Sequence, residues 1–452
     1  MALEERLQLT KLFAFVAAVT PDELEKFRRH IDSDWIEEAL QATGTATVRR
    51  RRLPAELVLW LVVGMALMRN ESIERVAAML DIALPAPGRP LVAKSAIAQA
   101  RQRLGEDPVA YLFVLTAAEW AHRSADRYRW RGLALYGADG TTLRVADSPE
   151  NWAEFGGQPP GARNGSAYPT VRLVALMALR SHVLAAVRFG SFGTGETTLA
   201  RELWRETPDD SLTIVDRGLF VFEELYALEK HGRNRHWLAR LRKRAGQIHK
   251  VTHLGPNDWL IDLEISRKTR SVSPELPQFL RLRLISYQRK GFRPSALLTT
   301  LLDPALYPAT EIVGLYHERW ELEIGYDEVK THLLAREETI RSRTPQGVRQ
   351  EIWGVALAYN LVRVEMERAA EEAGVQPTRI SFVNALALIR NAWLSWSMPP
   401  LAPGRIPEGI LDLQRHMALL LLPERRDRTY PRAVKIKMSG YARKPPSGRG
   451  RK

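Results

Sequence analysis

The 452-residue sequence contains no cysteine. This absence excludes disulfide bonds, catalysis by a cysteine thiolate and any zinc site with cysteine ligands. A long apolar segment is also missing: the longest apolar run, residues 57–68, is far too short to cross a bilayer and is typical of a buried helix. The first residues mix acidic and basic side chains and carry no signal-peptide pattern, so we expect a cytoplasmic protein.

Patterns for several other chemistries are absent as well. Four histidines lie close together without a matched carboxylate or a second metal motif, and we interpret them as non-ligands: His231, His236, His249 and His253. The glycine-rich stretch Gly190–Thr197 lacks the lysine of a phosphate-binding loop and is interpreted as a turn between a strand and a helix.

The charge balance is strongly one-sided, with a formal net charge of +14 and a pI near 10.0. Such a surplus favours a polyanionic partner, nucleic acid before all others. An anionic membrane surface is the rival partner, but it requires a basic amphipathic helix or a lipidation motif, and neither is convincing here. We therefore predict double-stranded DNA as the partner, association with the nucleoid and no membrane binding.

The apolar periodicity changes several times along the chain. These changes predict an α/β protein with a basic tail that should be disordered. Its predicted parts are an all-helical N-terminal DNA-binding domain (1–125), a mixed-sheet core in two pieces (126–242 and 309–395), a β-rich insertion between them (243–308), and a helical C-terminal region with the tail (396–452).

Within the N-terminal part, KSAIAQARQRLG places basic and amide side chains on a short predicted helix. This pattern favours a helix-turn-helix-like module that contacts DNA through Lys94, Gln99, Arg101 and Arg103. A solvated basic helix in a structural bundle is the alternative, and the sequence leaves both interpretations open.

Two apolar runs in the core each lead to an aspartate and a glycine turn. LALYGADG presents Asp139, and SLTIVDRGLF presents Asp216. We predict that each run is a strand that ends at its aspartate.

A later stretch, YHERWELEIGYDEVK, has helical periodicity. On a straight helix, Tyr316, Arg319, Glu323 and Lys330 fall within an arc of roughly 60°. The apolar stripe beside this arc predicts a buried seam of Leu315, Leu322, Tyr326, Val329 and Leu333. The other side chains are predicted to face solvent: His317, Glu318, Glu321, Asp327, Glu328 and Thr331. Ordinary charged pairs at three- and four-residue spacing would also explain the arc.

Carboxylates at strand ends and on a late helix are the ligands that magnesium prefers. We predict that three of them bind two Mg²⁺ (or Mn²⁺) ions, which would serve phosphoryl transfer at a DNA phosphodiester: Asp139, Asp216 and Glu323. Arg319 and Lys330 would hold the phosphates of the strand being cut. Tyr316 would donate a hydrogen bond to phosphate or stack on a base.

The four aligned residues match the Y-(2)-R-(3)-E-(6)-K signature of the DDE transposases of the insertion-sequence-four family. GADGTTLRVADSPENWAEFG and TIVDRGLF resemble that family's first and second aspartate blocks. KSAIAQARQRLG resembles its N-terminal domain, and IRSRTPQGVRQEIWGVALAYNLVR and YPRAVKIKMSGYARK resemble its C-terminal portion. One departure is Tyr326, where an apolar aromatic, usually Phe, is common. Because Tyr326 lies on the predicted core seam, we expect no effect on the chemistry.

The resemblance implies an RNase H-like core that the β-strand insertion interrupts. It also implies cut-and-paste transposition: nicking, strand transfer by the freed 3′-hydroxyl and often a hairpin intermediate. The three carboxylates would be metal ligands, and Tyr316, Arg319 and Lys330 would contact the inverted-repeat end of the transposon. In relatives a tryptophan of the insertion traps a flipped base; Trp259 is the candidate here, and a buried strand tryptophan is the alternative. Synapsis of two ends implies a homodimer in the complex.

Two other functions remain open at this point. One is an RNase H-like nuclease or resolvase that cuts DNA without strand transfer. The other is a DNA-binding regulator with an idle catalytic fold, against which the presence of all three carboxylates argues.

The charge surplus generates a first prediction. Affinity for duplex DNA should fall steeply as salt concentration rises, because bound lysines and arginines release counterions from the phosphates. A salt titration of binding to a labelled duplex measures this slope. An affinity that stays flat with salt would contradict the charge argument.

Overall fold

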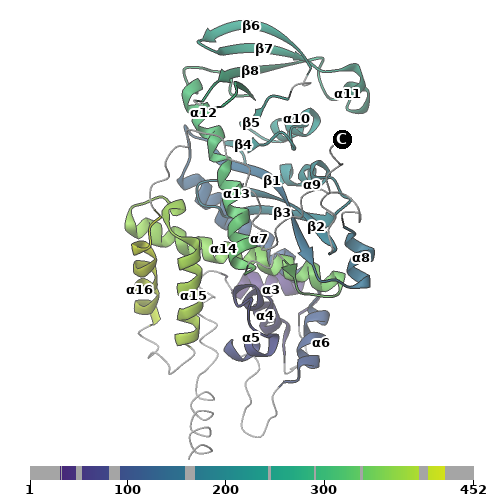
Figure 1. Ribbon diagram of the computed structural model, residues 1–452, viewed down its shortest axis with the longest axis vertical. Helices are drawn as coiled ribbons and strands as arrows, with labels where there is room; N and C mark the ends of the chain where they lie inside the picture. The colour runs from purple at the N-terminus through teal and green to yellow at the C-terminus, as the bar shows by residue number, and fades with distance from the viewer. Residues whose placement is uncertain are drawn as a thin grey trace, which may run out of the picture.

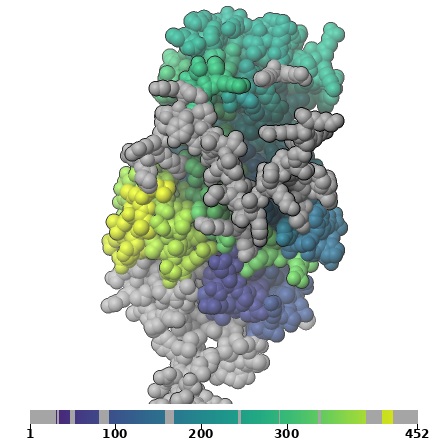
Figure 2. All heavy atoms as spheres, viewed as in Figure 1, coloured from purple at the N-terminus to yellow at the C-terminus, as the bar shows by residue number. Residues whose placement is uncertain are grey.

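The computed structural model describes residues 31–46 (except 32), 53–80, 92–157, 168–242, 246–289, 292–335, 339–396 and 406–422. Three tiers follow one another along the long axis: the strands of residues 247–287 at one end, the main sheet with its helices in the middle, and the N-terminal helices at the other end (Figure 1). The space-filling view shows the same order, with teal residues at the top and purple and blue residues towards the bottom (Figure 2).

A single mixed sheet runs through the upper two tiers. At its centre, β1 (Ala134–Val145) pairs antiparallel with β2 (Thr170–Ala178) and parallel with β4 (Ser211–Val215). β3 (Leu184–Ser191) pairs antiparallel with β2, and β5 (Arg235–Arg240) pairs parallel with β4. This arrangement confirms the predicted mixed α/β class.

The strands predicted as an insertion continue this sheet. Moving outward from β5, the order is β9 (Ser295–Thr299), β8 (Phe279–Tyr287), β7 (Asp258–Glu264) and β6 (Gln247–Gly255). The fully buried Arg283 of β8 holds the outer strands to the chain that follows β9: its guanidinium binds the Asp258 carboxylate at 2.6 Å and the Tyr307 carbonyl at 2.6 Å. Short helix α11 (Arg267–Val272) connects β7 and β8.

Helices cover both faces of the main sheet. Residues alternate between the faces along a strand, so the contacts of each face can be separated. On one face, α7 (Asp107–Arg127) contacts Tyr136 of β1 through His122, and α9 (Glu196–Leu203) pairs with Arg172 of β2 through Glu196. On the opposite face, α13 (Trp320–Asp327) and α14 (Pro345–Ala373) pack over the sheet.

The predicted helix of residues 316–330 is part of a longer helical path with two irregularities. α12 (Ala309–Glu318) meets α13 at Arg319, and α13 passes into a π-helical segment (Glu328–Leu333). The Leu334 N–H donates to the Val329 carbonyl five residues earlier, as a π-helix requires. In Figure 1 this path runs from the outer strands across the sheet to α14.

The N-terminal helices are α3 (Ser33–Ala42), α4 (Ala55–Leu67), α5 (Ile73–Met79) and α6 (Lys94–Leu104). They are attached to the core mainly through packing of α4 against α14 and of α3 against α7. Nearly every residue of α4 is buried, so the helix is apolar all round and packs against α14 on one side and α5 and α6 on others. Gly354 of α14 makes the approach of α4 possible, because a Cβ there would lie 3.1 Å from the backbone oxygen of Val62.

At the other end of the chain, α15 (Phe382–Trp396) and α16 (Ile406–Leu419) also pack against α14. Three further elements are α8 (Pro149–Phe155), α10 (Phe222–Lys230) and β10 (Thr339–Ile340), which pairs with β1. The predicted basic tail lies outside the described residues. No helix in the described part of the chain is both long and apolar enough to span a membrane.

The contact between α4 and α14 generates a prediction about stability. Gly354→Ala should destabilise the protein by about 1–3 kcal/mol, because the added methyl group forces two helix backbones apart. Gly314→Ala is the matched control, since Gly314 is an exposed helical glycine with nothing within 4 Å of its Cβ position. There the substitution should stabilise by up to about 1 kcal/mol. Urea unfolding measures both, and shifts of the same sign would contradict the account.

Candidate active site

Two of the three predicted metal ligands lie at the same level of neighbouring strands. β1 and β4 run parallel, and their last paired residues are Ala138 and Val215. Asp139 and Asp216 come next, so the two residues are neighbours across the strands, since adjacent strands are about 4.8 Å apart, and the charge of Asp216 acts on the Asp139 carboxyl. The prediction that the first strand ends at Asp139 is wrong: β1 continues to Val145 in its pairing with β2, and only its pairing with β4 stops at Asp139.

The Asp139 carboxylate occupies a partly buried, negatively charged place. Its Oδ1 accepts the Gly140 N–H at 2.8 Å, and its side chain is 20% exposed. Burial raises the pKa of Asp139 to about 6; the Gly140 N–H opposes this shift, and the charge of Asp216 adds to it. A carboxylate whose charge is disfavoured in this way gains from a cation placed beside it.

Asp216 is held by the turn that follows it. Its Oδ1 accepts the N–H of Gly218 at 2.6 Å and that of Leu219 at 3.1 Å. A Cβ at position 218 would lie 2.9 Å from that oxygen, which explains why a glycine follows the strand here. These two bonds fix the carboxylate at the carboxyl end of β4, before the chain enters α10.

The third predicted ligand, Glu323, is linked to Asp139 through an arginine. The Arg319 guanidinium donates to Glu323 Oε1 at 3.0 Å, one helical turn away, and its Nη1 lies 3.8 Å from Asp139 Oδ2. Gly137 of β1 allows the helix this close, because a Cβ there would lie 2.8 Å from the Leu322 side chain. One guanidinium therefore joins the carboxylate of the helix to that of the strand.

The residue types at this place suit a divalent cation. All three predicted ligands are carboxylates, which Mg²⁺ prefers, and the Asp216 charge that raises the pKa of Asp139 marks a position where added positive charge is favourable. Within the described ranges, however, no three acidic or histidine side chains converge in a group that could hold a metal ion. Arg319 lies between Asp139 and Glu323, so joint metal binding by these two requires its guanidinium to move.

Tyr316 and Lys330, two predicted DNA contacts, are both largely covered. Tyr316 is buried; burial raises the pKa of its phenol, and the nearby Arg319 opposes this shift. Lys330 is half-buried, and together with Thr141 and Tyr326 it lines a cavity of about 30 Å³ between the helix and the sheet. Thr141 shares a face of β1 with Asp139, so Lys330 lies on the Asp139 side of the sheet.

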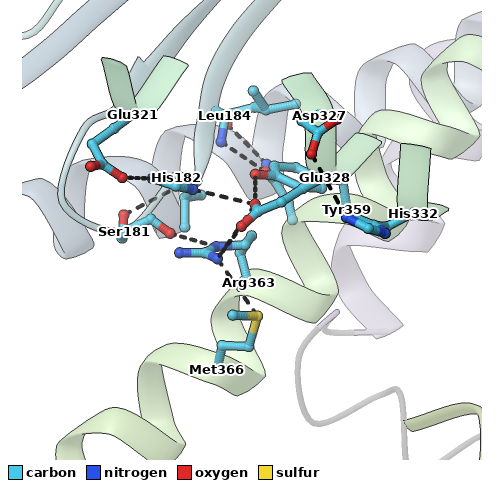
Figure 3. Close-up of polar contacts among 12 residues, drawn as sticks. Ser181, His182, Leu184, Glu321, Asp327, Glu328, His332, Tyr359, Arg363 and Met366 are labelled. Carbon is cyan, nitrogen blue, oxygen red and sulfur yellow. Dashed lines mark hydrogen bonds and ion pairs between the residues drawn. The ribbon is translucent and has the colours of Figure 1, made fainter. Parts of the chain in front are cut away.

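The prediction that Glu328 faces solvent is wrong. This residue begins the π-helical segment and is 8% exposed. The His182 ring, the Tyr359 hydroxyl and the Arg363 guanidinium all point towards its carboxylate, at 3.3, 2.7 and 3.3 Å (Figure 3). Burial raises the pKa of the Glu328 carboxyl, but the charges of Arg363 and His182 outweigh burial and hold the pKa below its usual value.

The predicted DNA contacts on α6 divide into two kinds. Lys94, Gln99 and Arg103 are exposed. The Arg101 guanidinium instead donates to Gln350 of α14 at 2.9 Å, and burial lowers its pKa. Arg101 therefore ties α6 to the core, and we do not retain it among the proposed DNA contacts.

Trp259 lies on β7 between β6 and β8, and it is half-buried. The Lys250 Nζ lies 4.3 Å from the centre of its ring, and the His253 ring lies 5.9 Å away. Because Lys250 and His253 are themselves exposed, the Trp259 ring lies at the surface and is not the fully buried tryptophan of the alternative. A role of Trp259 in trapping a base stays a prediction.

Comparisons with known proteins add an independent observation. Residues 21–114 match the family model of the insertion element 4 transposase N-terminal region, and residues 135–361 match that of the transposase DDE domain. The chain is 40% identical to the transposase InsG of insertion sequence element IS4 from Escherichia coli K12, over 92% of this chain and 93% of that protein. The chain belongs to the IS4 family of DDE transposases.

Two further likenesses were found for the transposase. It is 39% identical to the putative transposase InsZ of Escherichia coli K12, over 48% of this chain and 72% of that protein. A piggyBac transposase in a synaptic complex with hairpin DNA is a remote structural neighbour, with a TM-score of 0.43, 14% identity and coverage of 86% of this chain and 84% of that one. The matches to the two family models confirm the family that the sequence motifs predicted, and DDE domains generally use divalent metal ions.

Sequence reasoning missed one carboxylate of the transposase that lies near Asp139 on the other face of the sheet. Glu196 packs against Gly140, where a Cβ would lie 2.7 Å from its Cδ, and its charge helps to raise the pKa of Asp139. Arg172 pairs with Glu196 at 3.1 Å. In the sequence Glu196 has the pattern of an ordinary first-turn residue of a helix, so no local signal could have placed it here.

The Glu328 contacts generate a prediction. Glu328→Gln should destabilise the transposase by about 3–5 kcal/mol, because it leaves the buried Arg363 guanidinium without its counter-charge. Glu318→Gln is the control: Glu318 pairs with Arg180 in the same helical path, but both side chains are more than a quarter exposed, so the loss should be about 0–1 kcal/mol. Chemical denaturation measures both variants. Equal losses would show that the buried pair is not a special support of this helix.

Proposed function

We propose that the transposase binds the inverted-repeat ends of its own element, nicks the DNA there and joins the freed 3′-hydroxyls to target DNA. Asp139, Asp216 and Glu323 are the proposed ligands of two Mg²⁺ or Mn²⁺ ions. One observation carries this proposal. Asp139 and Asp216 directly follow the last paired residues of two parallel strands, and Arg319 contacts the carboxylates of both Asp139 and Glu323.

The catalytic core is proposed to be RNase H-like. The strand order β3-β2-β1-β4-β5, with β1 to β3 antiparallel and β4 and β5 parallel to β1, supports this proposal. The strands of residues 247–299 interrupt the core between β5 and the helix that carries Glu323. The proposed insertion therefore widens the sheet on the side of Asp216.

The charged side chains of the site would bind the DNA phosphates together with the metal ions. Bound divalent ions activate the attacking oxygen and stabilise the leaving oxygen of the phosphodiester. The planar guanidinium of Arg319 suits bidentate contact with a phosphate, and a DNA phosphate would offer it a replacement for its contacts with Asp139 and Glu323. Lys330, on the Asp139 side of the sheet, is proposed to contribute a second positive charge.

The proposal extends to the DNA and to a second copy of the chain. Exposed Lys94, Gln99 and Arg103 on α6 are proposed to contact the transposon end, together with Tyr316 at the catalytic helix. Pairing of two ends requires two active sites, so we propose a homodimer in the synaptic complex. A hairpin intermediate is proposed as well, with Trp259 as the candidate residue that would trap a flipped base.

Removing any one of the three carboxylates tests the proposal. Asp139→Asn, Asp216→Asn and Glu323→Gln should each abolish cleavage of a transposon-end duplex, because each removes a metal ligand while leaving the basic surface intact. Binding of the same duplex should persist in a gel-shift assay. Retained cleavage in any of these variants would remove that residue from the site.

Strand transfer needs its own assay, because a nuclease would pass the cleavage test. Pre-cut transposon ends are incubated with the transposase, Mg²⁺ and a supercoiled plasmid. The proposal expects end DNA covalently joined to the plasmid. Nicked or linear plasmid without joined ends would support a nuclease instead.

A further inference from the structure

The Tyr326 hydroxyl connects the helix that carries Glu323 to the backbone of Asp139. Tyr326 lies on α13 and is buried, as the core seam predicted. Its hydroxyl donates to the Asp139 carbonyl and accepts the Ala175 N–H at 3.2 Å. Asp139 of β1 is the pairing partner of Ala175 of β2. The hydroxyl therefore contacts the backbone of the residue pair that contains the first predicted metal ligand.

A buried hydroxyl needs hydrogen-bond partners such as the Asp139 carbonyl and the Ala175 N–H. A phenylalanine would fill the same apolar volume, whereas a buried phenol without hydrogen bonds would be costly. Burial raises the pKa of the Tyr326 phenol well above its usual value, and the Asp139 charge adds to the shift. The phenol is therefore protonated near neutral pH and can donate a hydrogen bond to the Asp139 carbonyl.

The hydrogen bonds of Tyr326 involve other atoms than the contacts of Arg319. Arg319 reaches the carboxylates of Asp139 and Glu323, the groups that metal ions and DNA phosphates would engage. Tyr326 reaches only backbone atoms of β1 and β2, which those ligands leave unchanged. Since Tyr326 follows Glu323 by three residues, about one helical turn, its bond fixes the helix relative to Asp139 even when Arg319 has moved.

We propose that Tyr326 is a positioning residue that sets the place of Glu323 relative to Asp139 so that both can bind the same divalent ions. This inference rests on the proposed function. It replaces the expectation from the sequence that a tyrosine at this position has no effect on the chemistry.

Tyr326→Phe removes the hydroxyl and keeps the ring. Binding of Mn²⁺ is measured on the full-length variant in complex with a pre-cut transposon-end duplex, from the loss of the free Mn²⁺ signal in electron paramagnetic resonance. The affinity should be about tenfold weaker than in the same complex of the unmodified chain, because partners that orient metal ligands typically contribute about 10–100-fold in affinity. Tyr136→Phe is the matched control. It removes another buried hydroxyl from β1, where the partner is His122 Nδ1 at 2.9 Å on the opposite face of the sheet, and should leave Mn²⁺ affinity unchanged.

A second readout separates positioning from general loss of structure. In end cleavage, Tyr326→Phe should raise the Mg²⁺ concentration that gives half-maximal rate about tenfold, and the rate at saturating Mg²⁺ should approach that of the unmodified chain. The melting temperatures of Tyr326→Phe and Tyr136→Phe, measured without metal, show whether the two variants are equally stable. A Tyr326→Phe variant with unchanged metal affinity and unchanged Mg²⁺ dependence would overturn the inference, as would an equal effect of Tyr136→Phe.

Asp139→Asn distinguishes failure of this inference from failure of the proposed function. If Asp139→Asn loses Mn²⁺ binding and Tyr326→Phe does not, the metal site stands and the role of Tyr326 is refuted. If neither substitution changes Mn²⁺ binding, the proposed metal site itself is refuted.

Discussion

Close packing of one helix against one strand is the constraint on which the rest of the structure depends. Glu323 lies far from Asp139 in the sequence, and it reaches the neighbourhood of that residue only because α13 lies directly on β1. Gly137 permits this approach, since any larger residue would meet Leu322. The sheet supplies Asp216 at the same level through the parallel pairing of β1 and β4. The site is thus built where two parallel strands and one helix meet.

Polar groups then fix this helix along its length. Arg319 binds the carboxylates of Asp139 and Glu323, Tyr326 binds the backbone of β1 and β2, and Glu328 is held by Arg363, Tyr359 and His182. Buried ion pairs add little net stability but are costly to break, because the partner left behind has no counter-charge. The π-helical segment at Glu328 is consistent with this view, since such segments often lie at functional sites. Its contacts support the stretch of helix that carries Lys330.

The sequence predicted the parts of the site that have a local signal. An apolar run before Asp216 and a glycine turn after it placed this residue at a strand end, and helical periodicity placed Arg319 one turn from Glu323. Three features depended on tertiary contacts and were missed. β1 runs past Asp139 because β2 continues to pair with it, Glu328 turns inward because the helix is not straight, and Arg101 bonds to Gln350 on a helix far away in the sequence. Each of these features lies where contacts between distant segments, and not a regular local pattern, decide the geometry.

The central claim is that Asp139, Asp216 and Glu323 share divalent ions when DNA is bound. A solved structure of the transposase with a transposon-end duplex and Ca²⁺ tests this claim most directly. We expect two ions about 3.5–4 Å apart, with carboxylate oxygens of all three residues about 2.3–2.6 Å from an ion and Arg319 moved onto a phosphate. A DNA-bound structure in which Glu323 lies beyond ligand distance of ions held by the two aspartates would contradict the account.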